Sequence, residues 1–127
     1  MTYTLGIDYG TSSVRALLVR CRDGHELATA VFDYATGHHG VMLDSRDANV
    51  ARQHPGDYLA GLENTIKAVL EQAATAAADF DATMVIGIGV DATGSSPLLV
   101  TQTNQALATQ PQFHEHLAAQ CWLWKDH

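Results

Sequence analysis

A carboxylate, three hydroxyl side chains and a guanidinium lie close together near the N-terminus. They belong to the segment Asp8-Tyr9-Gly10-Thr11-Ser12-Ser13-Val14-Arg15, in which a short polar turn joins two apolar runs. Gly10 can adopt backbone angles closed to other residues, so that neighbouring N–H groups and hydroxyls can converge on an anion. Asp8, at the end of the first apolar run, would hold a hydrated Mg²⁺. The segment predicts a phosphate-binding hairpin, and an ordinary two-strand turn capped by an aspartate is the alternative.

A second glycine-containing stretch accompanies a later apolar run. Gly87-Ile88-Gly89-Val90-Asp91-Ala92 matches the G-x-G-x-x-G/A pattern of dinucleotide-binding proteins. In those proteins the glycines form the turn between a strand and a helix, whereas here they lie inside the apolar run. We therefore expect them to be small residues that admit a close neighbour. Because no Walker P-loop sequence occurs, any nucleotide chemistry would use the hairpin type of site.

The elements that would position these residues begin with three strands. Residues 2–8, 14–20 and 26–34 are rich in strand-forming residues, and Asp23-Gly24 predicts a hairpin turn. Residues 36–53 show neither helical nor strand periodicity and are expected to form a long loop.

A helix and a buried strand are predicted next. Pro55 suits a first helical turn, and apolar residues recur on one face up to about Ala78. The almost wholly apolar run 83–90 suits a strand covered on both faces and parallel to the first. A further hairpin is expected over residues 97–109, and a weakly helical segment over 111–120.

The order β-β-β-α-β predicts an α/β fold, since a helix joining the third strand to one beside the first crosses over one face of the sheet. The sequence therefore indicates an actin-like, or ribonuclease H-like, half-domain with a mixed sheet, antiparallel in its first three strands. In that architecture the first hairpin and the loop at residues 91–96 lie at the same rim of the sheet and form a cleft wall.

Composition limits the class of protein. The chain has 127 residues, of which 46% are hydrophobic, and this predicts one globular domain over residues 1–127. Asp and Glu outnumber Lys and Arg by 14 to 7, which argues against a nucleic-acid partner. Cys21 and Cys121 form no paired framework, and no apolar run approaches the length of a membrane span. We expect a soluble, cytoplasmic protein.

Three motifs, in order along the whole chain, resemble those of the FGGY carbohydrate kinases. The first is Asp8 to Arg15, the second is Gly87-Ile88-Gly89-Val90-Asp91-Ala92-Thr93-Gly94-Ser95, and the third is Leu123-Trp124-Lys125-Asp126-His127. The second and third are most similar to those of family members that phosphorylate ribulose. Trp122 and Trp124 could also be read as one buried and one exposed residue of a strand.

The resemblance implies ATP-dependent phosphorylation of a ketopentose, such as L-ribulose to L-ribulose 5-phosphate, in a cleft between two actin-like domains. Asp8 would hold Mg²⁺, and the phosphates would be bound by Gly10, Thr11, Ser12, Ser13 and Arg15. Such groups suit phosphoryl transfer, which demands alignment and charge neutralisation. The sugar would be bound by Ala92, Thr93 and Gly94 and by Trp124, Lys125 and Asp126.

The departure from the family is length. FGGY kinases are several times longer, so the chain resembles the N-terminal part of their first domain. Their catalytic base is expected beyond His127, and the chain alone is expected to be inactive. A non-catalytic actin-like binding or assembly module and an actin-like or chaperone-like ATPase are the alternatives. The motifs distinguish neither L-ribulose from D-ribulose nor a monomer from a homo-oligomer.

Overall fold

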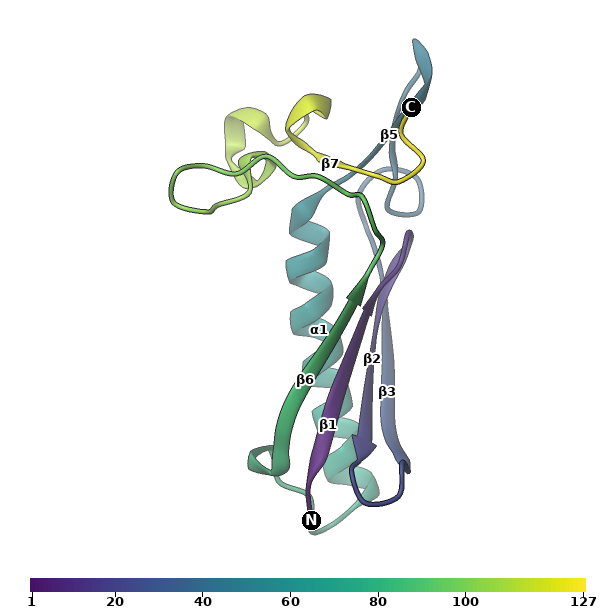
Figure 1. Ribbon diagram of the computed structural model, residues 1–127, viewed down its shortest axis with the longest axis vertical. Helices are drawn as coiled ribbons and strands as arrows, with labels where there is room; N and C mark the ends of the chain where they lie inside the picture. Colours follow the sequence, from purple (N-terminus) through teal and green to yellow (C-terminus); the bar gives the residue numbers. More distant parts are fainter.

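A mixed four-stranded sheet with one long helix on one face dominates the computed structural model, which describes residues 1–127 (Figure 1). Its strands, in the spatial order β3-β2-β1-β6, are β1 (Tyr3–Tyr9), β2 (Ser13–Arg20), β3 (Glu26–Asp33) and β6 (Val85–Ala92). The first three strands are antiparallel, and β6 runs parallel to β1. This confirms the predicted α/β class, the three-strand meander and the crossover through the helix α1 (Pro55–Ala76).

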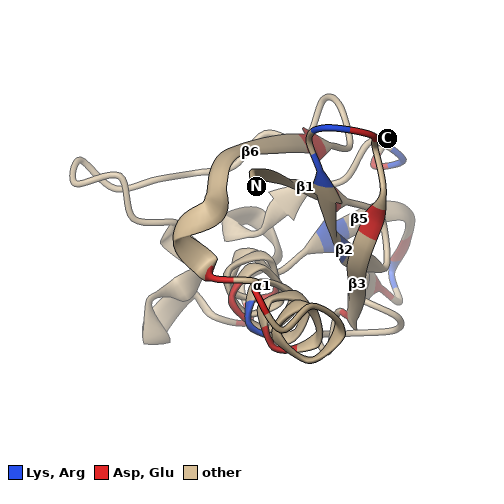
Figure 2. Cartoon of the chain, turned by 90° about the horizontal axis from the view of Figure 1, so that it is seen from below, with Lys and Arg blue, Asp and Glu red and all other residues tan.

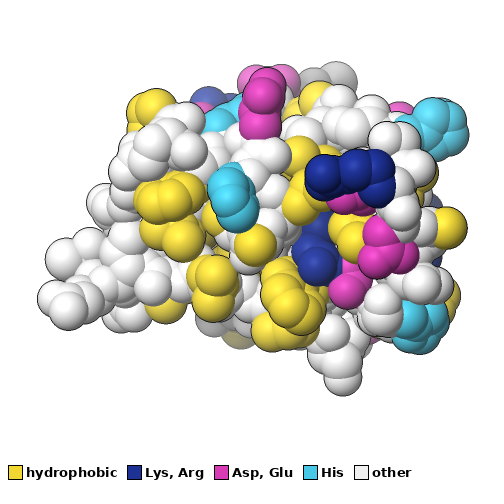
Figure 3. Space-filling view, turned by 90° about the horizontal axis from the view of Figure 1, so that it is seen from above, with side chains coloured by type: hydrophobic (Ala, Val, Ile, Leu, Met, Phe, Trp, Pro, Cys, Tyr) yellow, Lys and Arg dark blue, Asp and Glu magenta, His cyan; other side chains and the backbone are white.

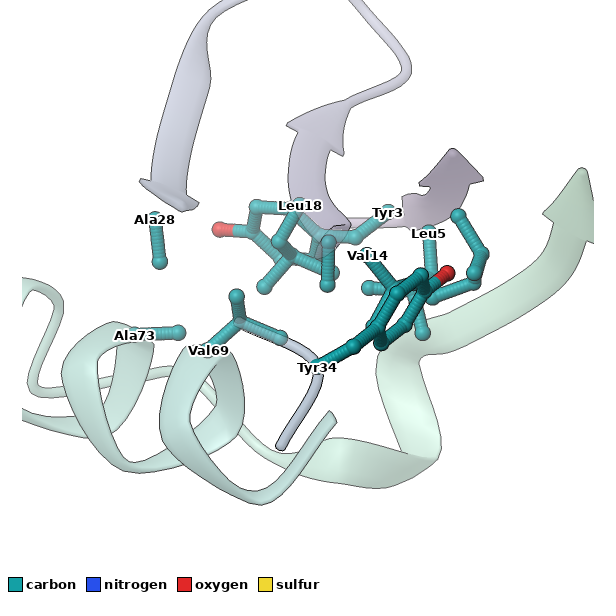
Figure 4. Close-up of a cluster of buried hydrophobic side chains, with 10 residues drawn as sticks. Tyr3, Leu5, Val14, Leu18, Ala28, Tyr34, Val69 and Ala73 are labelled. Carbon is teal, nitrogen blue, oxygen red and sulfur yellow. The ribbon is translucent and has the colours of Figure 1, made fainter. Parts of the chain in front are cut away.

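The core lies between α1 and the sheet. Side chains of β1 alternate between the helix-facing side and solvent, so that Tyr3, Leu5 and Ile7 are buried. They meet buried side chains of β2 and α1, including Val14, Leu18, Val69 and Ala73 (Figure 4). Viewed end on, the sheet wraps around one side of α1 (Figure 2). Of the charged residues of α1, Glu63, Lys67 and Glu71 are exposed, whereas Asp57 in the first turn is buried.

A glycine allows α1 to approach the sheet closely. A Cβ atom added to Gly61 would lie 2.3 Å from Cγ1 of Val14, a distance that side chains cannot tolerate. The helix therefore contacts β2 where the strand leaves the hairpin.

The start of α1 depends on a buried histidine. Pro55 occupies the first helical turn, as predicted, and Nδ1 of His54 accepts a hydrogen bond from the Gly56 amide at 3.0 Å. The other ring nitrogen of His54 lies 3.2 Å from the carbonyl oxygen of Ala108, which it contacts as a donor. His54 thus ties the helix start to the segment near residue 108.

The prediction of a long loop over residues 36–53 is wrong. This region contains β4 (Met42–Asp44) and β5 (Asp47–Gln53), which form a small sheet with β7 (Cys121–Trp122) in the order β4-β5-β7. The sequence of β5 shows no strand pattern, because the last two residues of its buried end are polar. Arg52 is 8% exposed and Gln53 is 1% exposed. A period-two pattern of apolar residues is therefore missing.

The region between β6 and β7 is less regular than expected. The predicted hairpin over residues 97–109 is reduced to one bridge, between Val100 and Ala106. The expected weak helix over 111–120 is two short 3-10 turns. The 3-10 turns of the chain are η1 (Ala82–Met84), η2 (Leu107–Thr109), η3 (Pro111–Phe113) and η4 (Leu117–Ala119).

The prediction that the apolar strand is covered on both faces is also wrong. β6 is an edge strand, and its side chains Ile86, Ile88 and Val90 are 61–66% exposed. Its glycines do not admit a tightly packed neighbour: the nearest atom to a Cβ on Gly87 would be 3.8 Å away, and Gly89 has none within 4 Å. No helix of the chain is long and apolar enough to cross a membrane.

Candidate functional site

The predicted phosphate hairpin (residues 8–15) forms a tight turn between β1 and β2. The amide of Gly10 donates to the Ser13 carbonyl oxygen at 2.8 Å. A Cβ on Gly10 would lie 3.2 Å from that oxygen, so the turn leaves little room for a larger residue there. Thr11 and Ser13 are half-buried and Ser12 is exposed. The three hydroxyls therefore lie on a turn whose backbone is fixed.

Asp8 lies on the sheet face that α1 leaves uncovered. It is exposed, its register partner on β2 is Arg15, and its partner on β6 is Asp91. Register partners share a face, so a guanidinium and a second carboxylate flank Asp8. Neighbouring carboxylates repel one another unless a cation lies between them, and carboxylate oxygens are the ligands that Mg²⁺ prefers. The donor set at this strand end thus fits a hydrated divalent cation.

The second loop (residues 91–96) leaves the sheet beside the hairpin, as predicted. The amide of Thr93 donates to the Tyr9 carbonyl oxygen at 3.2 Å, which continues the β1–β6 pairing past the strand end. Its hydroxyl lies 3.3 Å from that of Ser96. Ala92 and Gly94 are exposed. The loop is small and polar, and its backbone is accessible.

The third segment (residues 123–127) reaches the hairpin from the far end of the sequence. The indole Nε1 of Trp124 donates to the hydroxyl of Thr11 at 3.2 Å, across 113 positions. Trp124 is 56% exposed and Trp122 is 42% exposed, while Leu123 between them is buried. The alternative in which one tryptophan is buried is therefore wrong. Lys125 is exposed beside them.

Asp126 differs from the other predicted residues because its carboxylate is already bound within the chain. It forms an ion pair with Arg52 and accepts the amide of Ala51 at 2.8 Å. The Arg52 guanidinium also lies 4.2 Å from the ring centroid of Trp122 and donates through Nε to the Leu117 carbonyl oxygen. Burial lowers the pKa of Arg52 from its usual value. Arg52 thus fixes the third segment against β5.

Gln53, like Arg52, contributes to the site although no sequence motif predicts it. Its side-chain amide donates to the Thr11 carbonyl oxygen at 2.7 Å, and its side-chain oxygen accepts the hydroxyl of Tyr58 at 2.5 Å. Burial raises the pKa of Tyr58, so this phenol stays neutral and remains a donor. Arg52 and Gln53 follow no motif. The one available signal was their position directly before the helix start.

These elements converge beyond the ends of β1 and β6. Figure 1 shows the yellow C-terminal segment crossing above the sheet, and Figure 3 views that end from above, with charged side chains of both signs beside exposed apolar ones. A cavity of about 320 Å³ adjoins the second loop; its lining residues are Tyr9, Tyr58, Ala92, Thr93, Ser96, Leu98 and Cys121. The structure therefore brings all three motifs to one rim.

The chain is similar to known kinases along its whole length. It is 36% identical over 125 residues to a ribulokinase of Vibrio parahaemolyticus and 39% identical over 132 residues to one of Shouchella clausii. These alignments cover 98% of this chain, but 21% and 22% of the two relatives. No family model matches the chain.

Solved structures of two kinases share the fold. A xylulose kinase from Lactobacillus acidophilus superimposes with a TM-score of 0.70 at 15% identity, covering 99% of this chain and 20% of that one. A "xyloylose kinase" from Brucella ovis gives the same TM-score at 21% identity, over 98% of this chain and 21% of that one. The resemblance to the FGGY carbohydrate kinases is confirmed, and the chain spans about a fifth of the length of these relatives.

Proposed function

We propose that this chain is the N-terminal part of the first domain of an FGGY-type kinase. The whole enzyme would transfer the γ-phosphoryl group of ATP to the terminal hydroxyl of a ketopentose, with L-ribulose giving L-ribulose 5-phosphate, in the cytoplasm. The chain would form an actin-like half of one wall of the cleft. The hydrogen bond between Trp124 and Thr11 carries this proposal, because it joins the motif assigned to the sugar to the motif assigned to phosphate.

The hairpin would handle the phosphates. Asp8 would hold a hydrated Mg²⁺, which neutralises charge on the phosphate oxygens when it is bound. The Gly10 turn presents the hydroxyls of Thr11, Ser12 and Ser13 on a fixed backbone. Arg15, beside Asp8 on the uncovered face, would add a guanidinium for a phosphate oxygen. These groups would align the phosphates and neutralise their charge, which is most of what phosphoryl transfer requires.

The second loop and the third segment would bind the sugar. Ala92, Thr93 and Gly94 leave room for a polyol and offer backbone groups to its hydroxyls. The exposed ring of Trp124 suits the C–H side of a sugar, and Lys125 would reach its hydroxyls.

Asp126 would act on the sugar pocket indirectly. Since Arg52 and the Ala51 amide occupy its carboxylate, Asp126 would fix the segment that carries Trp124. The group that accepts the proton of the attacking hydroxyl would come from outside these 127 residues.

The test is ADP release by the full-length kinase that contains this chain. With MgATP and L-ribulose we expect turnover above about 1 s⁻¹, the low end for typical enzymes. Without sugar we expect almost none. ADP release that is equally fast without any sugar would overturn the proposal in favour of an actin-like ATPase. Binding without turnover of any ketopentose would favour a non-catalytic module.

A further inference from the structure

Thr11 forms hydrogen bonds with both β5 and the third segment, the two segments packed above the sheet. Its carbonyl oxygen accepts from Gln53 at 2.7 Å, and its hydroxyl oxygen accepts from Trp124 at 3.2 Å. Gln53 belongs to β5, and its backbone pairs with Cys121 of β7, two residues before Leu123. Both contacts therefore come from the layer that carries the third segment.

We propose that Thr11 couples the two substrate sites: Gln53 is a positioning residue for the hairpin, and Trp124 transmits occupation of the sugar site to the phosphate site. This inference rests on the proposed function and adds a cooperative link between sugar and nucleotide binding.

The two contacts differ in how easily they can change. Gln53 is 1% exposed and is held from the other side by Tyr58, so its contact with Thr11 belongs to the buried interior of the fold. Trp124 is 56% exposed, and the hydrogen bond to Thr11 is the polar contact that its indole makes. A sugar stacked on the exposed face would immobilise the ring. The entropy cost of ordering the ring would then already be met when the nucleotide binds, which produces cooperativity without a large rearrangement.

The hydrogen-bonding chemistry of the Thr11 hydroxyl also favours tighter nucleotide binding when Trp124 is in place. A hydroxyl that accepts the indole N–H keeps its own hydrogen free to donate. Accepting one hydrogen bond polarises the group and strengthens the bond that it donates. Trp124 would thus make Thr11 a better donor to an anionic phosphate oxygen.

The decisive variant is Trp124→Phe in the full-length protein, because phenylalanine keeps an aromatic face for the sugar and removes the N–H donor. We would measure binding of a non-hydrolysable ATP analogue with Mg²⁺ by calorimetry, with and without saturating L-ribulose. In the wild type the sugar should tighten analogue binding about fivefold or more, and the analogue should tighten sugar binding by the same factor. In Trp124→Phe the factor should fall to about one.

Trp122→Phe is the matched control, since it makes the same substitution at an exposed tryptophan whose ring lies against Arg52 and whose indole makes no hydrogen bond to the hairpin. It should keep the wild-type coupling factor. An unchanged coupling factor in Trp124→Phe would overturn the proposal. An equal loss of coupling in Trp124→Phe and Trp122→Phe would overturn it as well.

Gln53→Leu gives a readout that does not need catalysis. Hydrogen-exchange mass spectrometry should show amide exchange in the peptide covering residues 9–14 that is faster by about fivefold, the worth of one hydrogen bond. Unchanged exchange in that peptide would remove Gln53 as a positioning residue. If the hairpin loosens but no ketopentose is phosphorylated, the proposed function fails while the positioning role of Gln53 stands.

Discussion

Single residues divide into those that face a ligand and those that hold the others in place. Asp8 is exposed at a strand end between Arg15 and Asp91, and none of the hydrogen bonds within the chain uses its carboxylate. Asp126, by contrast, is bound by Arg52. The sequence motifs could not separate these two roles, because both residues are aspartates within a matching segment.

Asp8→Asn in the full-length kinase should lower kcat by roughly 10²-fold or more, with little change in the KM for the ketopentose. The reason is that charge neutralisation at the transferring phosphoryl matters more in the transition state than in the ground state. Steady-state kinetics at varied Mg²⁺ measures this, alongside thermal melts of both proteins. Near-normal kcat, or a loss that unfolding explains, would mean that Asp8 only caps the turn.

Asp126→Ala should lower the free energy of unfolding by about 3 kcal/mol, because it leaves the buried Arg52 without its partner. Urea unfolding of the full-length protein measures this, with Arg52→Met and the double variant completing a cycle. The double variant should lose less than the sum of the two single losses. Unchanged stability combined with weaker ketopentose binding would instead make Asp126 a direct sugar ligand.

Elements were predictable where a local pattern specifies them. The meander and α1 follow from alternation, a hairpin turn and Pro55 at a helix start. β5 was not predictable because two of its three buried residues are polar and are paired with partners far away in sequence: Arg52 with Asp126, and Gln53 with Thr11. β7 has only two residues and exists through its pairing with β5. No single-segment pattern can report such contacts.

The N-terminus of α1 should make stability depend on pH. Burial, with the neighbouring His114, lowers the pKa of His54, while the Ala108 carbonyl and Asp57 act in the opposite direction. The unfolded chain therefore binds a proton near pH 6.5 that the folded chain resists, so stability falls as pH drops below about 6.5. Protonation of Nδ1 would also remove the acceptor of the Gly56 amide.

Thermal melts between pH 7.5 and 5.5 test this, with His54→Asn as the comparison, because asparagine caps a helix without titrating. The wild type should lose about 1 kcal/mol more than the variant over this range, the typical worth of a helix cap. Parallel pH profiles for the two proteins would show that His54 does not titrate as described.

At the scale of the whole molecule, the chain spans about a fifth of the length of its relatives, and its sheet ends at an exposed, apolar β6. Parallel strands are normally covered on both faces, so the sequence of β6 alone could not indicate an uncovered edge. That the hairpin and the second loop share a rim was predictable, because strand order and register place the ends of β1 and β6 together. The third segment reaches this rim through the β5–β7 pairing, which the sequence did not indicate.

The 127-residue chain by itself should not turn over either ribulose isomer. We propose that the full-length kinase supplies the catalytic base and an adenine-binding domain from other parts of its chain, and positioning without them does not complete phosphoryl transfer. A coupled ADP-release assay measures this, with the full-length kinase as the positive control. Turnover above about 1 s⁻¹ by the short chain would show that it contains a base of its own.

Substrate preference tests most directly whether the three motifs form part of a ketopentose kinase site. The measurement is kcat/KM of the full-length kinase for L-ribulose, D-ribulose, xylulose and glycerol under one set of conditions. We predict that a ribulose isomer has the highest value and that glycerol has the lowest, because the small second loop and the exposed Trp124 face suit a longer polyol. A kcat/KM that is highest for glycerol would show that the three motifs do not form a ketopentose site.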